Sequence, residues 1–315
     1  MDKVSLGRSG ITVPPVIFGC NVFGWTVDKA QSFRLLDALV DAGLNALDTA
    51  DVYSYWVPGN TGGESETIMG EWLKARGRRH DVLILTKAGM EMPGKGKGLS
   101  AAWLAKAVED SLTRLGTDVI DLFQAHRDDE VTPHADVLGA FETMIKAGKV
   151  RAIGASNYSA ARFREALDAS AAHNLPRFET MQPHYNLLER GIEADLLPLC
   201  AAEGVGVIPY YALASGFLTG KYRSEADFGK SPRGALGAGK YLDAKGLRVL
   251  AALDDVAARL GATPAQVALA WFKGRPGLAA PIASATTLDQ LADLARAAAL
   301  TLDAEAVAML DAASA

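Results

Sequence analysis

Short runs of apolar residues alternate with longer amphipathic stretches from one end of the chain to the other. The short runs have the length of buried strands, and they predict strands near residues 16–19, 44–48, 82–86, 119–124, 151–154, 178–182, 205–209 and 279–282. The longer stretches predict helices near 29–42, 64–76, 101–115, 134–147, 159–172, 192–203 and 246–274, the last as two helices. Ser100, Ser159 and the pair Thr263-Pro264 stand where helix N-caps are expected. The pattern is that of an α/β protein.

Eight strands with helices between them predict a (β/α)₈ barrel, which we expect to be a single domain over residues 1–315. A doubly wound sheet also alternates strands and helices, but no Gly-x-Gly-x-x-Gly follows the first strand. Residues 1–15 precede the barrel, and within them 4–13 predicts a hairpin that turns at Ser9-Gly10 and would close the barrel bottom. Residues 214–245, rich in Gly, Ser and Lys, form the longest irregular segment and a candidate lid.

The composition of the chain indicates its cellular compartment and excludes some classes of partner. Hydrophobic residues make up 49% and charged residues 22%, as in ordinary globular proteins. The net charge of −5 argues against a surface for nucleic acid or anionic membranes. Two cysteines, Cys20 and Cys200, form neither a CxxC nor a zinc-ligand pattern, which is typical of a reducing compartment. Because no such ligand pattern occurs, we expect no bound metal. Because neither a signal peptide nor a run of ~18 apolar residues occurs, we expect a cytoplasmic protein.

Four polar residues stand at or just past the ends of predicted buried strands: Asp48, Tyr53, Lys87 and His126. In a parallel barrel these residues would meet on one rim. A phenol has an unperturbed pKa of ~10, which is too high for an efficient acid at neutral pH. A nearby Lys87 ammonium, held by Asp48, would favour the phenolate and lower the pKa of Tyr53. His126 could donate a hydrogen bond to a substrate oxygen or relay a proton, so the set predicts proton transfer to an oxygen.

The chain resembles the aldo-keto reductase family from Leu6 to Ala297. The stretches that carry the resemblance are Leu47–Tyr53, Thr86-Lys87, Ala125-His126, Gly154–Asn157, Leu213–Tyr222 and Asp289–Leu291. The resemblance implies a (β/α)₈ oxidoreductase that binds a nicotinamide cofactor in extended form. It also implies that Tyr53 is the general acid, that Lys87 and Asp48 tune it, and that His126 orients the carbonyl.

The resemblance places the cofactor as well. Ser156, Asn157 and Gln182 would hold the carboxamide, and Tyr210 would stack beneath the nicotinamide ring. Within the lid, Leu213, Ser215 and Lys221 would cover the pyrophosphate, and Arg233 would contact the adenosine phosphate. The other implied contacts are Cys20, Asn21, Asp48, Tyr211, Ala212, Ala214, Ser284, Thr286 and Gln290. Taken without the family, Ser156-Asn157 reads as a turn, Tyr210-Tyr211 as a core or rim pair and Arg233 as an exposed loop arginine.

Departures from the family pattern leave the cofactor's identity open. Tyr211-Ala212 stands where Ser-Pro is common, and Ser284–Thr286 replaces the usual Gly-Ala-Lys/Arg/Ser tract. Because residues 283–290 contain no Lys or Arg, a 2′-phosphate would depend on Arg233, Thr286 and Gln290. The family favours NADP(H), and NAD(H) is the alternative.

Three aromatic residues, Trp25, Tyr55 and Trp56, lie in the first two βα loops, where the family builds its substrate pocket. They predict an apolar wall suited to a ring-bearing or hydrophobic carbonyl compound. The leading hypothesis is reduction of an aldehyde or ketone, or oxidation of the corresponding alcohol, with such a small molecule as the partner. One alternative is a cofactor-sensing regulatory subunit resembling potassium-channel β-subunits. Another is an aldolase or isomerase with Lys87 as Schiff-base nucleophile, in which Tyr53 and Asp48 would have no clear role.

Overall fold

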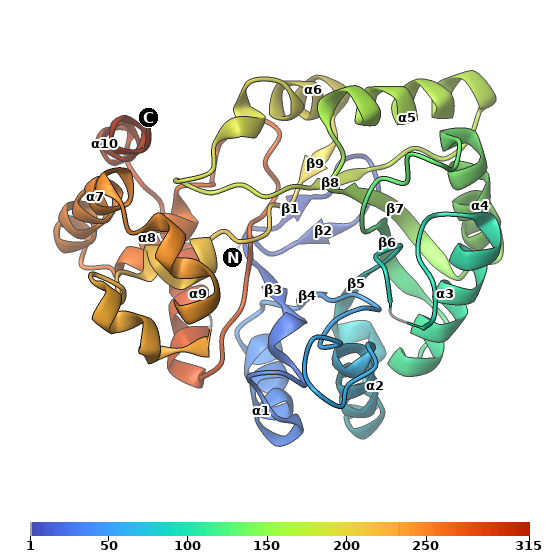
Figure 1. Ribbon diagram of the computed structural model, residues 1–315, viewed down its shortest axis with the longest axis horizontal. Coiled ribbons are helices and arrows are strands. Elements are labelled where there is room, and N and C mark those ends of the chain that lie inside the picture. Colours follow the sequence, from blue (N-terminus) through green and yellow to red (C-terminus); the bar gives the residue numbers. More distant parts are fainter. Residues whose placement is uncertain (1, 93, 233) are drawn as a thin grey trace.

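A ring of parallel strands surrounded by helices forms the body of the molecule (Figure 1). The computed structural model describes residues 2–92, 94–232 and 234–315. Within these residues the main sheet has eight strands in the order β10-β3-β4-β5-β6-β7-β8-β9, and every pairing is parallel. The strands are β3 (Ile17–Gly19), β4 (Ala46–Asp48), β5 (Leu83–Ala88), β6 (Ile120–Ala125), β7 (Val150–Ser156), β8 (Thr180–Gln182), β9 (Gly206–Val207) and β10 (Ile282–Ala283).

Backbone hydrogen bonds also join the two ends of this sheet. The Val207 N–H donates to the Gly277 carbonyl at 2.8 Å, and the Ala279 N–H donates to the Val207 carbonyl at 2.8 Å. These bonds connect β9 to the segment that leads into β10 and close the ring. The predicted (β/α)₈ fold is confirmed.

Helices connect successive strands and form the outer layer. They are α1 (Lys29–Asp41), α2 (Glu64–Arg76), α3 (Ala101–Leu115), α4 (His134–Lys146), α5 (Ala160–His173), α6 (Leu196–Glu203), α7 (Ala244–Leu260), α8 (Pro264–Ala270), α9 (Leu288–Ala299) and α10 (Ala304–Ser314). The Ser100 and Ser159 side chains accept hydrogen bonds from the N–H groups of Trp103 and Arg162, and so cap α3 and α5 as predicted. Thr263 caps α8, which begins at Pro264.

Two helices lie beyond the predicted set, which ended at residue 274. Both α9 and α10 are rich in alanine, a strong helix former whose small side chain gives little contrast between an apolar and a polar face. The lid segment also differs from the expectation of irregular structure. It contains four short helical turns, η4 (Ala214–Thr219), η5 (Glu225–Lys230), η6 (Gly234–Ala238) and η7 (Gly239–Tyr241).

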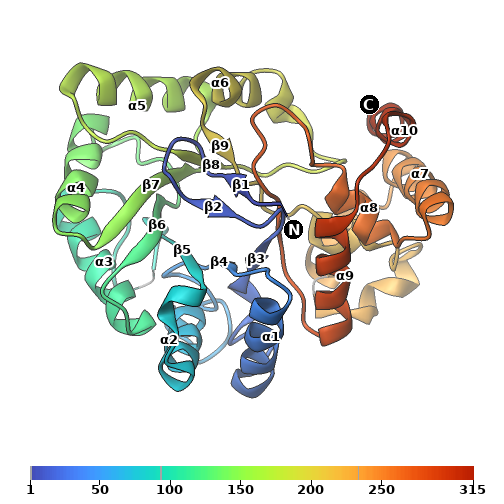
Figure 2. The same ribbon diagram turned by 180° about the vertical axis from the view of Figure 1, so that it is seen from behind.

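The N-terminal hairpin closes the bottom of the barrel, as predicted (Figure 2). Its strands β1 (Val4–Ser5) and β2 (Thr12–Val13) are antiparallel, with Val4 opposite Val13. Leu6, Ile11 and Val13 are buried among apolar residues of the barrel interior. These interior residues are Ile17, Ala46, Leu85, Leu122, Ala152, Ile208, Ala280 and Ile282. The hairpin therefore leaves the opposite, C-terminal end of the strands as the open mouth.

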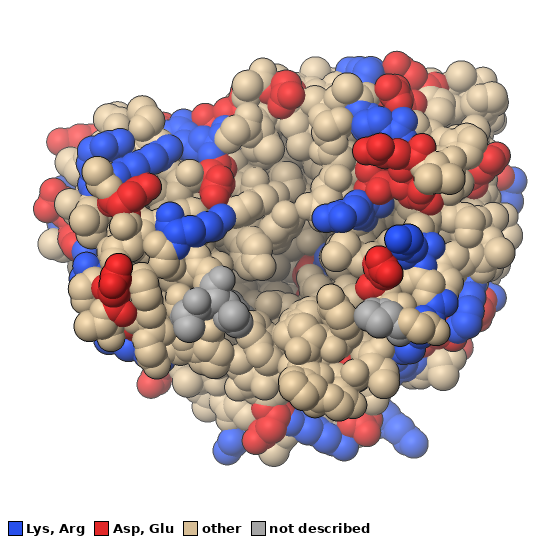
Figure 3. Space-filling view, in the orientation of Figure 1, with Lys and Arg blue, Asp and Glu red and all other residues tan. Residues whose placement is uncertain are grey.

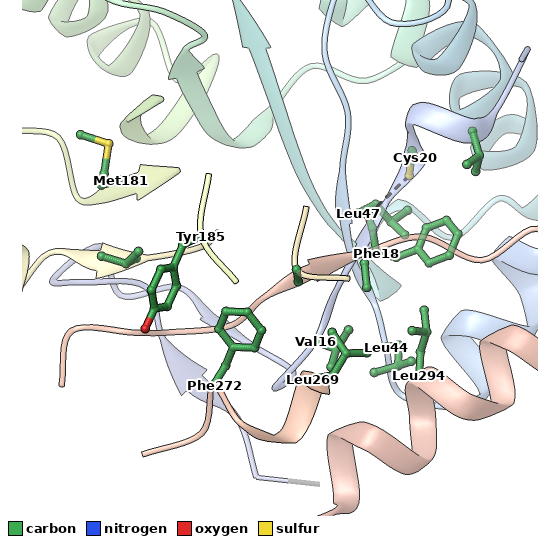
Figure 4. Packing of buried hydrophobic residues seen from close by; sticks show 14 of the residues in the cluster. Val16, Phe18, Cys20, Leu44, Leu47, Met181, Tyr185, Leu269, Phe272 and Leu294 are labelled. Carbon is green, nitrogen blue, oxygen red and sulfur yellow. Dashed lines mark hydrogen bonds between the residues drawn. The ribbon is translucent and has the colours of Figure 1, made fainter. Parts of the chain in front are cut away.

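A second and larger apolar layer fills the space between the strands and the helices. Figure 4 shows part of it, where Val16 and Leu44 from the strand side meet Leu269 of α8 and Leu294 of α9. Its strand residues face away from the barrel interior, because successive side chains point to opposite faces, and its other residues come largely from the surrounding helices. Cys20 and Cys200 are both buried and unpaired. Among the described residues, no helix is long and apolar enough to cross a bilayer.

Candidate active site

The four residues singled out from the sequence lie on neighbouring strands at the barrel mouth. Asp48 is the last residue of β4, Lys87 is the penultimate residue of β5, and His126 directly follows β6. Tyr53 lies in the loop after β4. Strands β4, β5 and β6 are adjacent in the sheet, so the structure brings together the residues that follow them.

A buried ion pair forms the floor of this site. The Lys87 Nζ donates to Asp48 Oδ1 at 2.6 Å and to the Thr49 carbonyl at 2.6 Å, and neither Lys87 nor Asp48 is more than 1% exposed. Gln182 Nε2 donates to the second carboxylate oxygen of Asp48 at 2.9 Å, and Gln124 Nε2 lies 3.5 Å from the same oxygen. Because an unpaired buried charge is costly, this arrangement stabilises the ammonium in one place.

Tyr53 and His126 lie above this pair. The Tyr53 ring is 5.0 Å from Lys87 Nζ, and its centroid is 6.0 Å from that of the His126 ring at an interplanar angle of 74°. The backbone N–H of Asp51 donates to the Lys87 carbonyl at 3.0 Å, which anchors the loop that carries Tyr53. A phenol, an imidazole and an ammonium are therefore held together at one rim.

Burial keeps both rings uncharged. Burial, then Lys87, then Arg127 lower the pKa of His126 well below its usual value, so its imidazole is neutral. Burial, followed by the negative charge of Asp48, raises the pKa of Tyr53 well above its usual value. This direction is opposite to the one expected from the sequence, because burial of the phenol has the largest effect on its pKa and the charge of Asp48 adds to it. The phenol therefore holds its proton at neutral pH.

The residues expected around a nicotinamide carboxamide form one hydrogen-bonded group beside His126. Ser156 Oγ donates to the Gln182 carbonyl at 2.8 Å, and Asn157 Nδ2 donates to the His126 carbonyl at 2.9 Å. The Tyr210 hydroxyl donates to Asn157 Oδ1 at 2.8 Å. Gln182 links this group to the Asp48–Lys87 pair, so the two predicted sets are continuous in space.

A third predicted group lies where β10, β3 and β4 are neighbours. Ser284 Oγ donates to Asn21 Oδ1 at 2.8 Å, and both the backbone N–H and the hydroxyl of Thr286 donate to Gln290 Oε1. Cys20 is buried beside this group, and the pKa of its thiol is raised by burial and by Asp48.

The loop after β9 has strained backbone. Tyr211, Ala214 and Ser215 all have positive φ, at 53°, 48° and 58°. Such conformations are unfavourable for residues other than glycine and are concentrated at functional sites. The loop also contains Ala212 and Leu213, so strain and the predicted pyrophosphate contacts coincide. Lys221, farther along, places its ammonium 5.0 Å from the Tyr222 ring. Arg233 lies outside the described residues.

The three predicted substrate residues pack edge to face and extend from Tyr53. The ring centroids of Tyr53 and Trp56 are 6.1 Å apart, those of Trp25 and Trp56 are 5.7 Å apart, and those of Tyr55 and Trp56 are 5.9 Å apart. Trp56 is 41% exposed and Tyr55 is 40% exposed, so this aromatic wall is open to solvent. The space-filling view shows a hollow at the mouth that is lined largely by uncharged atoms (Figure 3).

Some polar residues at the mouth were missed by the sequence prediction. Gln124 is a buried amide within β6, and a polar residue inside an apolar strand was the available signal. Asp51 is a buried carboxyl in the Tyr53 loop, and His184 stacks on Tyr210 with centroids 5.4 Å apart. Nothing in their local sequence distinguishes Asp51 and His184 from ordinary loop residues.

Comparison with known proteins agrees with this geometry. A family model described as the aldo/keto reductase family matches residues 15–315. The chain is 34% identical over 319 residues to the "Uncharacterized oxidoreductase YrpG" of Bacillus subtilis (strain 168), covering 99% of this chain and 95% of the relative. It is 34% identical over 303 residues to a "Probable voltage-gated potassium channel subunit beta" of Oryza sativa subsp. japonica, covering 93% and 90%. It is 33% identical over 336 residues to "Aldo-keto reductase AFTS1" of Alternaria alternata, covering 96% and 87%.

Proposed function

The chain belongs to the aldo/keto reductase family, and we propose that it reduces an aldehyde or ketone with a nicotinamide cofactor, or oxidises the corresponding alcohol. The observation that carries this proposal is the buried Asp48–Lys87 ion pair beneath Tyr53 and His126. A protonated phenol beside a neutral imidazole is the pair of donors that a carbonyl oxygen needs when it becomes an alcohol.

The residues around the mouth fit a nicotinamide cofactor. His126 Nδ1 is buried and has no hydrogen-bond partner within the described part of the chain, so this face of the mouth can still bond a ligand. The amides of Asn157 and Gln182 offer both donors and acceptors next to it. The strained loop at 211–215 and the ammonium of Lys221 suit an anionic pyrophosphate.

The reaction then divides between the cofactor and the protein. The nicotinamide, when bound, supplies the hydride for reduction and accepts it for oxidation. Tyr53 transfers its hydroxyl proton to the carbonyl oxygen, while the neutral imidazole of His126 donates a hydrogen bond that orients this oxygen. The Lys87 ammonium, positioned by Asp48, stabilises the negative charge that develops on Tyr53 as its proton leaves.

A Tyr53→Phe variant tests this proposal. General acid catalysis contributes roughly 10²- to 10⁴-fold, so turnover of a carbonyl panel should fall at least ~100-fold while cofactor binding persists. Tyr158→Phe is a control, because Tyr158 is a buried tyrosine outside the site and its hydroxyl has no partner in the described structure. Full turnover by Tyr53→Phe, with normal cofactor binding, would refute the assignment.

The preference for NADP(H) over NAD(H) is part of the proposal and follows the family. Fluorescence titration of the protein with NADPH and with NADH measures it directly. Thr286 and Gln290 already bond each other, and no Lys or Arg occurs in 283–290. The difference in affinity between NADPH and NADH should therefore be modest, and it should become smaller when Arg233 is replaced. Absence of quenching by either nucleotide would contradict the whole assignment.

A second candidate is a cofactor-sensing subunit, and the similarity to a plant protein named as a potassium channel subunit favours it. Such a subunit would bind nucleotide tightly, turn over carbonyl compounds negligibly and associate with a partner protein. A pure sensor has no need of a proton donor, whereas this chain has Tyr53 beside Lys87 and His126. Turnover across a carbonyl and alcohol panel separates the two functions.

A further inference from the structure

Arg127 is an exposed side chain that directly follows His126 at the mouth. Within the described structure it has no ion pair and no hydrogen bond. Its charge nevertheless affects the pKa values of two residues at the mouth, His126 and Tyr210. It contributes, after burial and Lys87, to lowering the pKa of His126, and it opposes the burial that raises the pKa of Tyr210. Arg127 is therefore an exposed arginine, one residue past His126 at the end of β6, without an ion pair in the described structure.

The two acidic residues that directly follow Arg127, Asp128 and Asp129, have other partners. Asp128 accepts two hydrogen bonds from Arg162, at 2.7 Å and 3.2 Å. Asp129 accepts from the Leu99 N–H and from the Thr132 hydroxyl, both at 2.7 Å. Asp128 and Asp129 are thus bonded to other groups, and the exposed Glu130 forms no ion pair with Arg127 in the described structure. Figure 3 shows basic side chains on two sides of the hollow.

Apolar and cationic groups therefore meet at Tyr53. Its ring centroid is 6.0 Å from that of His126, the residue before Arg127, and 6.1 Å from that of Trp56 in the aromatic wall. We propose that Arg127 binds an anionic group, a carboxylate or a phosphate, of a substrate whose apolar part packs against Trp25 and Trp56. This inference rests on the proposed function, because the carbonyl of that substrate lies at Tyr53.

The chemistry of arginine supports this role. A guanidinium presents N–H groups in a planar fork that matches the oxygens of a carboxylate or phosphate. Because Arg127 has no internal partner, binding an anion breaks no existing ion pair. A neutral analogue of the same shape gains nothing from the charge, so the residue acts on specificity rather than on proton transfer.

Matched aromatic aldehydes test the proposal: 4-formylbenzoate, its neutral methyl ester and 4-formylphenyl phosphate. Arg127→Gln should raise KM roughly tenfold for the preferred anion, which corresponds to ~1.4 kcal/mol. It should leave kcat, and KM for the ester, nearly unchanged. The wild-type preference should weaken at high salt, since an exposed ion pair is screened. Arg127→Lys should restore part of the preference, and comparison of the two anions identifies carboxylate or phosphate.

Two controls separate this role from a structural one. Arg34→Gln removes an exposed arginine from the outer helix α1 and should change no KM. Binding of 4-formylbenzoate, followed by the fluorescence of Trp25 and Trp56, gives a readout that needs no turnover. An equal loss for ester and anions, or a loss confined to cofactor affinity, would overturn the inference. If no carbonyl compound is turned over, the proposed function fails, and this binding comparison still decides the role of Arg127.

Discussion

Asp51 is a carboxyl group buried two residues before Tyr53, with a side chain only 1% exposed. Neither carboxyl oxygen has a hydrogen-bond partner among the described residues. Burial, followed by the charge of Glu66, raises the pKa of Asp51 from 3.8 to about 8, and Arg114 offsets only part of this. The perturbation we consider is Asp51→Asn, which replaces a protonated acid with a neutral amide of the same shape.

The direction of the effect follows from proton linkage. Between pH values near 3.8 and 8 the folded protein holds a proton on Asp51 that the unfolded chain has released. Stability of the wild type therefore falls as pH rises through this window, by up to ~1.4 kcal/mol per unit. With these two pKa values, the loss between pH 5 and pH 7 is about 2–3 kcal/mol. Asn cannot ionise, so the Asp51→Asn protein should escape this loss.

Urea unfolding of both proteins near pH 5 and pH 7 measures the difference. The free energy of unfolding of the variant minus that of the wild type should increase by about 2–3 kcal/mol between the two pH values. Other titrating groups are common to both proteins and cancel. Asp118→Asn is the control, because Asp118 is exposed and water solvates its carboxyl in both states.

A difference that stays constant with pH would refute the reasoning. It would mean that Asp51 is ionised in the folded protein, with a closer approach to Arg114 than the structure has. A difference that shrinks with rising pH would mean that the carboxylate is stabilising, and that burial does not dominate at this position.

Two further predictions concern the buried Asp48–Lys87 ion pair and the rings above it. Lys87→Met leaves Asp48 buried with Gln182 as its main partner, and should lower the free energy of unfolding, measured with urea, by about 3–5 kcal/mol. Adding Asp48→Asn should recover much of this loss. If the double variant recovers none of it, a buried ion pair is contradicted. Because the pKa of Tyr53 is raised and that of His126 lowered, neither ring changes its protonation from about pH 7 to 9. These two rings should therefore add no titration to kcat/KM for carbonyl reduction over this range. Because Asp51 has a pKa of about 8, the profile is also measured in Asp51→Asn, and a titration that persists in this variant would show that one of the two directions is wrong.

Much of this candidate site could be predicted from the sequence because its polar residues stand at the ends of strands. Asp48, Lys87 and His126 each interrupt or follow an apolar run, and parallel strands place such positions on one rim. The resemblance to a family then connected distant positions such as Ser156 and Tyr210, which the structure brings within one hydrogen-bonded group. Local patterns alone would have left these two as a turn and a rim aromatic.

Other features were decided by contacts between segments that are far apart in the chain. The direction of the Tyr53 pKa shift depends on how deeply the phenol is buried and on its distance from the charge of Asp48. The short strands β9 and β10 depend on each other's backbone for closure of the ring. The free charge of Arg127 depends on where its acidic neighbours find partners.

By itself, the order of apolar and polar residues determined three features: the alternation of strands and helices, the cap residues, and the polar side chains at strand ends. These features depend on local periodicity and on neighbours in the chain. Tertiary structure alone decided which charges are paired, that the carboxyl of Asp51 is buried without a partner, and that Arg127 forms no ion pair in the described structure. The physical reason is that solvation and Coulomb energy depend on three-dimensional distance and burial, which no local pattern contains.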